Sequence, residues 1–341
     1  MTNPRRELVS LMRGAFACPV ISFLGRRGFA EPLLNGGLSL EGRVAQAELA
    51  AILRYLVALG LIEEPRPLHF LATKLGGKVL RRFGAFCLLD SYDSYFRDLD
   101  WIWPASDLPR PEVNRERNVI GSGQLHARKF FPAILRHVAN RSYGHLTDLG
   151  CGDGSFLREA LSVSPGLAVT AVDLSETAIR LVRQDLAARR PAVRHSAVVC
   201  NALDVSEWAQ AVPAPEGTRQ LITMWFVLHE VFDGTVANLA AFFREIHRRF
   251  PAAEVAFGEL VRLPPEWMSR GRHESIMPEY ALFHALSGQR LLSEGELASL
   301  LEQIPYRVAD RQVFDPVASG AESAPSSLVC LLEPRASALQ R

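Results

Sequence analysis

A glycine-rich turn between a short apolar strand and a helix constrains this sequence more than any other feature. The run Leu146–Leu149 is apolar enough for a buried strand. In the turn that follows, three glycines alternate with other residues, at Gly150, Gly152 and Gly154. Glycines at this spacing let the backbone turn sharply and let a ligand approach where a Cβ would clash. Ser155 then opens a predicted helix whose free N–H groups would face the bound group, so the turn is a candidate nucleotide site.

An acidic residue at the end of the next predicted strand supports this interpretation. The strand Leu167–Val172 leads into Asp173, which lies 25 positions after Asp148. A carboxylate at this place can accept hydrogen bonds from a ribose diol. The glycine spacing differs from the G-x-G-x-x-G of nicotinamide enzymes. It resembles motif I of S-adenosylmethionine (SAM) methyltransferases of the seven-stranded Rossmann-like class.

The resemblance covers roughly residues 115–341 and implies that SAM is the cofactor. Residues after the third strand, where members of the class contact the adenine, include Asn201 and Ala202. The expected cofactor contacts are Asp148, Gly150, Gly152, Gly154, Asp173, Leu174, Asn201, Ala202 and Met224.

Strands and helices alternate from residue 145 onward, which predicts an α/β fold with a parallel sheet covered on both faces. Further strands are expected at 193–200, 220–228 and 254–261, and helices near 276–287 and 294–303. Two last strands, 307–314 and 328–332, fit the antiparallel pair that closes the sheet of this methyltransferase class. We therefore expect a seven-stranded Rossmann-like domain.

The N-terminal part is predicted to be mainly helical. Helical apolar spacing over 6–30 and 41–59 precedes two short strands near 61–64 and 68–71, and Thr73 can cap the next helix. This order is typical of a winged helix, but the candidate recognition helix carries a single cation, Arg54, so DNA binding is disfavoured. The order also resembles the dimerisation domain of small-molecule O-methyltransferases, which implies a homodimer. The expected domains are 1–83 for dimerisation, 84–130 as a helical linker that contributes to the substrate pocket, and 131–341 for catalysis.

Composition excludes several other classes. The 341 residues include 38 basic and 37 acidic ones, so a net charge of +1 gives no field that would attract nucleic acid or an anionic membrane. No uninterrupted apolar run reaches the length of a membrane span, and the N-terminus lacks a signal-peptide core. Five cysteines without a C-x-x-C pair indicate neither a disulfide framework nor a structural zinc site. We expect a cytoplasmic enzyme.

A histidine marks the end of the predicted fourth strand, where ligands lie in such sheets. His229 and Glu230 resemble the His-Asp motif of O-methyltransferases, in which the histidine is the general base for a substrate hydroxyl. Glu230 replaces the usual aspartate, and Val231-Phe232 replace the tryptophan that usually follows, so the atom that is methylated stays open. Glu230 would be a metal ligand, a base or a partner that orients the histidine.

A second histidine, His284, lies on a predicted helix one turn after Tyr280. As a pair, His229 and His284 resemble the two iron ligands of a subgroup of these enzymes that C-methylates α-keto acids such as phenylpyruvate and 2-ketoarginine. The resemblance implies catalysis through a metal-chelated enolate, in the biosynthesis of natural products and non-proteinogenic amino acids. It assigns Arg128 to the substrate carboxylate.

Aromatic residues supply the candidate pocket walls, because ligand sites favour aromatic linings. The expected substrate contacts are Trp101, Trp103, Arg128, Phe226, Tyr280 and Phe283. A guanidinium substrate would instead require a spare carboxylate, and the candidates are Asp107, Glu230 and Glu274.

Two alternatives to C-methylation remain at this point. One is a metal-independent O- or N-methyltransferase of a small molecule with His229 as general base. The other is a SAM-binding or winged-helix regulator without catalysis, which the neutral charge and the strand-end histidine disfavour.

Overall fold

The computed structural model describes residues 4–41, 47–104, 106–189, 193–212, 217–265, 267, 276–314, 317–319 and 322–335. The chain forms two compact units, Met1–Leu125 and His126–Arg341. Most of the predicted linker is therefore grouped with the N-terminal residues.

The N-terminal unit is mainly helical, as predicted, and holds a small antiparallel sheet. The predicted hairpin is confirmed, because β2 pairs with β3 in antiparallel fashion. Gly60 ends α3 with a φ of +70°, and the Thr73 side chain caps α4 by accepting a hydrogen bond from the Gly76 N–H at 3.0 Å. The helices are α1 (Pro4–Arg26), α2 (Ala30–Leu34), α3 (Ala47–Ala58), α4 (Lys74–Leu80), α5 (Phe83–Asp90), α6 (Asp93–Arg97), the 3₁₀ helix η1 (Leu99–Ile102) and α7 (Arg115–Lys129), which continues into the second unit. The strands lie in the order β1 (Leu38–Ser39), β3 (His69–Ala72), β2 (Ile62–Arg66).

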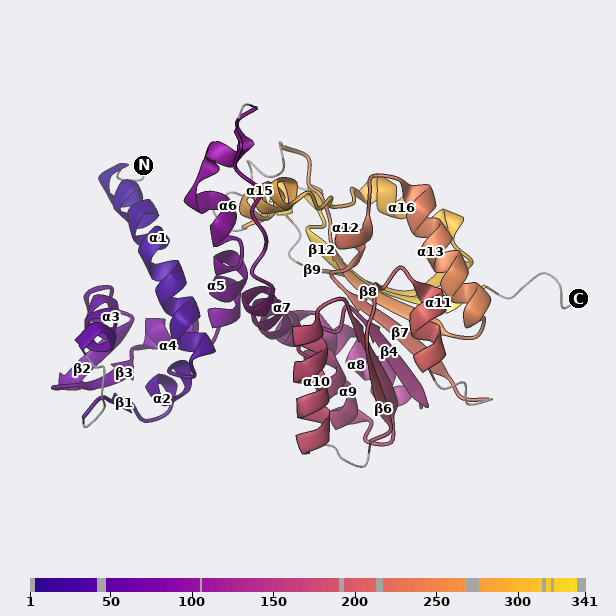
Figure 1. Ribbon diagram of the computed structural model, residues 1–341, viewed down its shortest axis with the longest axis horizontal. Helices are drawn as coiled ribbons and strands as arrows, with labels where there is room; N and C mark the ends of the chain where they lie inside the picture. Colours follow the sequence, from indigo (N-terminus) through magenta and orange to yellow (C-terminus); the bar gives the residue numbers. More distant parts are fainter. Residues whose placement is uncertain are drawn as a thin grey trace, which may run out of the picture. The chain divides into compact units, whose positions relative to one another are not determined.

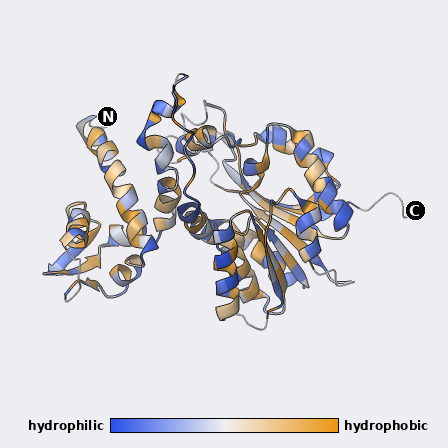
Figure 2. Ribbon diagram, in the orientation of Figure 1, coloured by the Kyte–Doolittle hydropathy of each residue, from blue (hydrophilic) through white to orange (hydrophobic). Residues whose placement is uncertain are grey.

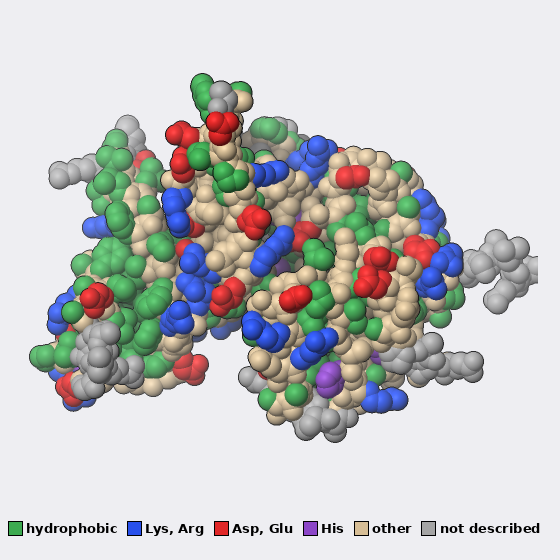
Figure 3. Space-filling model, in the orientation of Figure 1, with side chains coloured by type: hydrophobic (Ala, Val, Ile, Leu, Met, Phe, Trp, Pro, Cys, Tyr) green, Lys and Arg blue, Asp and Glu red, His purple; other side chains and the backbone are tan. Residues whose placement is uncertain are grey.

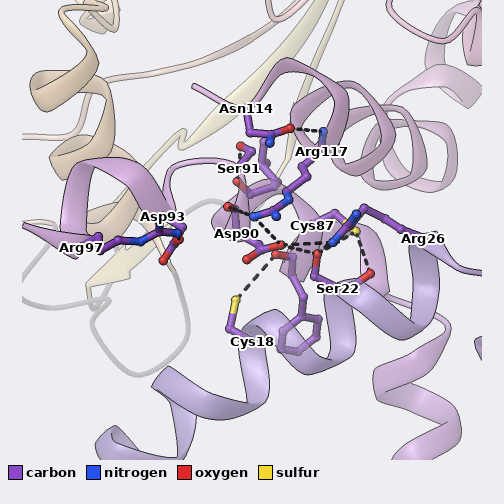
Figure 4. Close-up of polar contacts among 12 residues, drawn as sticks. Cys18, Ser22, Arg26, Cys87, Asp90, Ser91, Asp93, Arg97, Asn114 and Arg117 are labelled. Atoms are coloured by element: carbon purple, nitrogen blue, oxygen red, sulfur yellow. Dashed lines mark hydrogen bonds and ion pairs between the residues drawn. The ribbon is translucent and has the colours of Figure 1, made fainter. Parts of the chain in front are cut away.

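A buried carboxylate joins three helices of this unit (Figure 4). Asp90, at the end of α5, accepts a hydrogen bond from Ser22 of α1 at 2.6 Å and pairs with Arg117 of α7 at 3.3 Å. Arg26 lies 3.9 Å from the same oxygen. Because a buried charge that loses its partner is strongly destabilising, this network fixes α1 against α5 and α7.

One face of α1 presents apolar side chains to solvent (Figures 2 and 3). Leu8, Leu11, Met12 and Phe16 are 59 to 76% exposed. By length and composition alone, the stretch Glu7–Arg26 could cross a membrane, with a mean hydropathy of 1.6, and 17% of it is buried. Isolated polar residues interrupt its apolar ones, so the sequence contains no long uninterrupted run.

The C-terminal unit contains the predicted seven-stranded sheet (Figure 1). The first five strands along the chain pair in parallel, and β12 runs antiparallel to both of its neighbours, which confirms the predicted closing pair. The order is β6 (His195–Val199), β5 (Ala168–Asp173), β4 (His145–Leu149), β7 (Gln220–Trp225), β8 (Glu254–Leu260), β12 (Ser327–Pro334), β9 (Tyr306–Phe314).

Helices cover both faces of this sheet, because side chains of each strand alternate between two apolar clusters. In β7, for example, Met224 belongs to one cluster and Trp225 to the other. One face is packed by α8 (Phe131–Asn140), α9 (Ser155–Val163) and α10 (Glu176–Arg189). The other is packed by α11 (Val205–Trp208), α12 (Leu228–Val231), α13 (Val236–Arg249) and α16 (Glu294–Gln303). The unit also contains η2 (Ala209–Ala211), α15 (Met277–Ser287) and the hairpin of β10 (Val317–Ser319) and β11 (Glu322–Ala324).

The predicted fourth strand was three residues too long at its carboxyl end. The strand ends at Trp225 because Phe226 has a φ of +58°, in the left-handed region, which an extended strand cannot accommodate. The N–H of Phe226 still donates to the Gly258 carbonyl at 2.9 Å. His229 therefore lies in the short helix α12, just beyond the strand end. The β10–β11 hairpin was not predicted at all.

Candidate active site

The glycine turn after β4 has the conformation that its sequence predicted. Gly150, Gly152 and Gly154 have φ values of +69°, +54° and +74°. A Cβ at position 150 would lie 2.4 Å from Cγ2 of Val227, and one at position 154 would lie 3.0 Å from Cγ2 of Val182. Both the backbone conformation and the available space therefore require glycine at 150. The turn leads directly into α9, whose first N–H groups lie at the carboxyl end of β4.

Asp173, at the end of β5, reaches back to this turn. One carboxylate oxygen accepts the Gly152 N–H at 2.9 Å and the other accepts the Ser175 N–H at 2.8 Å. The side chain stays partly exposed, and its neighbour Leu174 is 70% exposed. The Asp173 carbonyl accepts the N–H of Cys200, which places exposed Asn201 at the same edge of the sheet. The predicted loop, acidic strand end and third-strand residue thus lie at adjacent carboxyl ends.

Asp148 is a buried carboxyl group beneath this turn. The hydroxyl of Thr223 donates a hydrogen bond to it at 2.6 Å. Burial, together with the charges of Asp173 and Asp153, outweighs this hydrogen bond and raises the pKa of Asp148 to about 7. Asp148 is therefore a buried group of β4, directly before the turn.

The raised pKa of Asp148 makes stability depend on pH. In the folded chain the group keeps its proton up to about pH 7, whereas in the unfolded chain it loses the proton near its ordinary value. The folded state thus binds more protons between these values, and its stability falls as pH rises through that window. Between pH 5 and pH 8, the wild type is expected to lose unfolding free energy on the order of 2 kcal/mol. Asp148→Asn, whose side chain stays neutral, is expected not to show this loss. Urea unfolding of both proteins at the two pH values measures this. A difference between the two proteins that is the same at pH 5 and pH 8 would contradict the assignment.

His229 is held by a carboxylate that the sequence analysis did not single out. Glu259 of β8 accepts the His229 backbone N–H at 3.1 Å and contacts Nδ1 of its ring at 2.7 Å. Burial opposes a positive charge on His229, but the Glu259 carboxylate more than compensates, and the pKa of the imidazole is raised. The contact assigns the Nδ1 proton toward Glu259 and leaves Nε2 as the functional nitrogen.

His284 of α15 lies against His229. The ring centroids are 4.6 Å apart and the rings are nearly perpendicular. Nδ1 of His284 is 2.6 Å from the carbonyl of Tyr280, so Nδ1 carries the proton that it donates to this carbonyl. Nε2 of the neutral ring is therefore unprotonated, with a lone pair that can bind another group. Burial and the neighbouring His229 lower the pKa of His284 to about 3. Within the described residues, Nε2 of neither histidine makes a hydrogen bond. Neither Nε2 atom is fully buried, so a bound molecule could reach it.

A comparison with known proteins identifies the domain that contains the glycine turn and His229. Residues 147–250 match the family described as "Methyltransferase domain". The chain carries a SAM-dependent methyltransferase domain. This agrees with the glycine turn at the carboxyl end of β4, since ligands lie at the carboxyl ends of the strands in open sheets of this kind.

Several known proteins resemble this chain. A 205-residue stretch, 58% of this chain, is 27% identical to 2-ketoarginine methyltransferase from Streptomyces arginensis and spans only about half, 56%, of that protein. An O-methyltransferase family protein from Burkholderia thailandensis has a similar structure, with 14% identity, a TM-score of 0.61, and coverage of 99% of this chain and 100% of that one. Human N-acetylserotonin methyltransferase, solved in complex with SAM, gives 16% identity, a TM-score of 0.58 and coverage of 98% and 99%. The structural similarities establish the fold.

The other predicted residues of the methyltransferase domain are placed as follows. Phe226 stacks on His126, and Tyr280 and Phe283 form an aromatic group beside His284. Glu230 is exposed, so the carboxylate that orients His229 is Glu259 instead.

The remaining predicted residues differ in their surroundings. Arg128 is exposed and has no ion pair within the described residues, Ala202 is half-buried, and Met224 is fully buried in the core of the sheet. Trp101, whose Nε1–H donates to the Tyr95 carbonyl at 3.1 Å, and exposed Trp103 and Asp107 belong to the N-terminal unit, and Glu274 lies outside the described residues. Their assignments stay predictions.

A local sequence signal could have revealed Glu259. It is a carboxylate at the carboxyl end of a parallel strand whose middle residues, 255–258, carry no polar side chain, and its side chain is 1% exposed. Charged groups are fully buried almost only when they are paired. A search for charges at strand ends, rather than for histidine motifs alone, would have found it.

Proposed function

We propose that this methyltransferase transfers the methyl group of SAM to the β-carbon of an α-keto acid. The observation that carries the proposal is the His229–His284 pair, in which each Nδ1 is hydrogen-bonded and neither Nε2 has a partner among the described residues. The partial similarity to a 2-ketoarginine methyltransferase supports the same substrate class.

The reaction requires a nucleophile in line with the methyl–sulfur bond. Transfer of a proton from the β-carbon to a base, which can be solvent water, makes that carbon nucleophilic. The new carbon–carbon bond then forms as the methyl–sulfur bond breaks, and S-adenosylhomocysteine leaves. A site at the carboxyl ends of β4, β7 and β8 would place His229 and His284 on the acceptor side and the glycine turn on the SAM side.

The two histidines fit a metal ligand pair. Each Nδ1 donates to a carboxylate or carbonyl, which is the arrangement that orients metal-binding imidazoles. Among the described residues, no group of three or more histidine, cysteine or acidic side chains could hold a metal, so other positions would be left to substrate and water. We propose iron as the metal. When bound, it would stabilise negative charge on the keto oxygen as a Lewis acid.

The acceptor is proposed to be phenylpyruvate-like or 2-ketoarginine-like, in natural-product or non-proteinogenic amino-acid biosynthesis. Phe226, Tyr280 and Phe283 favour an aromatic acceptor, whereas the curated relative favours a guanidinium one. We further propose a homodimer that buries the exposed apolar face of α1.

A second candidate function is favoured by the His229–Glu259 pair. An imidazole that a buried carboxylate holds and makes more basic is suited to act as general base toward a hydroxyl or amine. This would be a metal-independent O- or N-methyltransferase.

One experiment separates the two functions. The purified protein is incubated with methyl-labelled SAM and, separately, phenylpyruvate, 2-ketoarginine and a panel of phenols and amines, with and without an iron chelator. We expect product from a keto acid alone, with the label on the β-carbon by NMR, and loss of that product with the chelator. A methyl ether or methylamine formed in the presence of chelator would overturn C-methylation in favour of the second function.

A further inference from the structure

His126 is a third histidine close to His229, and the proposed function leaves it unexplained. It is the first residue of the C-terminal unit and is 7% exposed. Its ring lies flat on the ring of Phe226, with centroids 3.9 Å apart and planes 19° from parallel. Phe130 and Phe131 approach it edge-on. This packing fixes the plane of the imidazole on three sides.

Neither ring nitrogen of His126 has a hydrogen-bond partner among the described residues. Neither nitrogen is fully buried, however. Burial, followed by the charge of His229, lowers the pKa of His126 to about 3, so the ring is neutral at physiological pH. A neutral imidazole carries one donor and one acceptor. Because the residue is largely buried while its nitrogens are not sealed off, a bound molecule can supply the hydrogen-bond partner that the described residues do not.

The backbone that holds Phe226 against His126 is strained. Phe226 adopts a φ of +58°, in the left-handed region, where non-glycine residues are strained and tend to lie at functional sites. Gly258 makes room for the turn, since a Cβ there would lie 2.9 Å from the ring of Trp225 and 3.5 Å from that of Phe226. The strained residue is thus the one whose ring stacks on His126, and it precedes His229 by three positions.

A role of His126 as a third metal ligand is not supported, because no group of three such side chains in the described part of the chain could hold a metal. An imidazole N–H that aromatic packing holds in a fixed plane suits an oxygen atom of the acceptor as its hydrogen-bond partner.

We propose that His126 binds the methyl acceptor by donating its ring N–H to a carbonyl or carboxylate oxygen. The inference rests on the proposed keto-acid function and adds a recognition residue to it. His126 thereby sets the affinity for the acceptor and leaves the affinity for SAM unchanged.

Two variants separate recognition from packing. His126→Phe keeps a flat ring against Phe226 and removes both nitrogens, whereas His126→Gln keeps an N–H donor. His195→Gln is the matched control, because His195 is exposed on β6 and its Nδ1 contacts the Val193 carbonyl of its own segment. Calorimetry with phenylpyruvate and 2-ketoarginine, on protein saturated with S-adenosylhomocysteine, gives acceptor affinity without turnover. A separate titration gives SAM affinity, and thermal unfolding shows whether each variant is folded.

We expect His126→Phe to weaken acceptor binding about 10- to 100-fold, His126→Gln to restore much of it, and the control and all SAM affinities to stay at wild-type values. If the wild type binds a keto acid and folded His126→Phe binds it equally well, His126 has a packing role and the inference fails while the proposed function stands. If His126→Phe does not fold, His126→Gln decides, and equal loss of SAM and acceptor binding in it would overturn the inference. If the wild type binds neither keto acid, the proposed function itself is wrong and the inference falls with it.

Discussion

Replacing His229 with asparagine is expected to lower methyl transfer by about 10²- to 10⁴-fold. An asparagine amide can donate to Glu259 in place of Nδ1 but has nothing in place of Nε2. The variant therefore removes the reactive nitrogen without leaving the buried carboxylate unpaired. Turnover of the acceptor by wild type and variant, with SAM affinity as a check on the cofactor site, measures the effect.

His284→Asn distinguishes the two proposed chemistries. If iron is bound by the pair, elemental analysis should find near-stoichiometric iron in the wild type, little in either variant, and unchanged iron in His195→Asn, the exposed control. If His229 acts as a base alone, the wild type contains no iron and His284→Asn keeps most of its activity. Full activity of His229→Asn would contradict both chemistries.

Glu259→Gln is expected to lower kcat about 10- to 100-fold. The glutamine keeps the size of the side chain and can still accept hydrogen bonds, but it removes the charge that raises the pKa of His229. In the metal-independent chemistry, the base of the wild type must lose a proton that Glu259 stabilises. The rising limb of kcat/KM against pH should therefore move to lower pH in Glu259→Gln. A pH series of kcat/KM for the two proteins measures the shift.

Glu254 provides the matched control for this experiment. It lies at the opposite end of the same strand, is similarly buried, and pairs with Arg141 at 2.7 Å. Glu254→Gln should reduce stability without shifting the pH profile, because its partners lie away from His229. If Glu254→Gln and Glu259→Gln reduce kcat equally, the effect of Glu259 reflects a general loss of buried charge, and its role in positioning His229 is refuted.

Local sequence patterns determined most of the fold. The strand, glycine turn and helix at 145–163 form as predicted, because positive φ values and the close approach of Val227 leave no alternative to glycine at Gly150. The parallel pairing of β4 to β8 was predicted from the alternation of strands and helices, and β12 pairs in antiparallel fashion, as the family resemblance implied. The signals that predicted these features, the glycine spacing and the alternation of strands and helices, lie in residues that are close in sequence.

Only the tertiary structure decided which groups surround the candidate histidines. The end of β7 depends on the left-handed Phe226 and its hydrogen bond to Gly258, 32 positions away in a neighbouring strand. Glu259, rather than the adjacent Glu230, holds His229, and His126 reaches Phe226 across 100 positions. Such contacts arise when parallel strands bring their carboxyl ends to one edge, and no local period or spacing encodes them. The sequence by itself therefore determined the cofactor turn and the candidate histidines, whereas tertiary packing selected the side chains that orient those histidines.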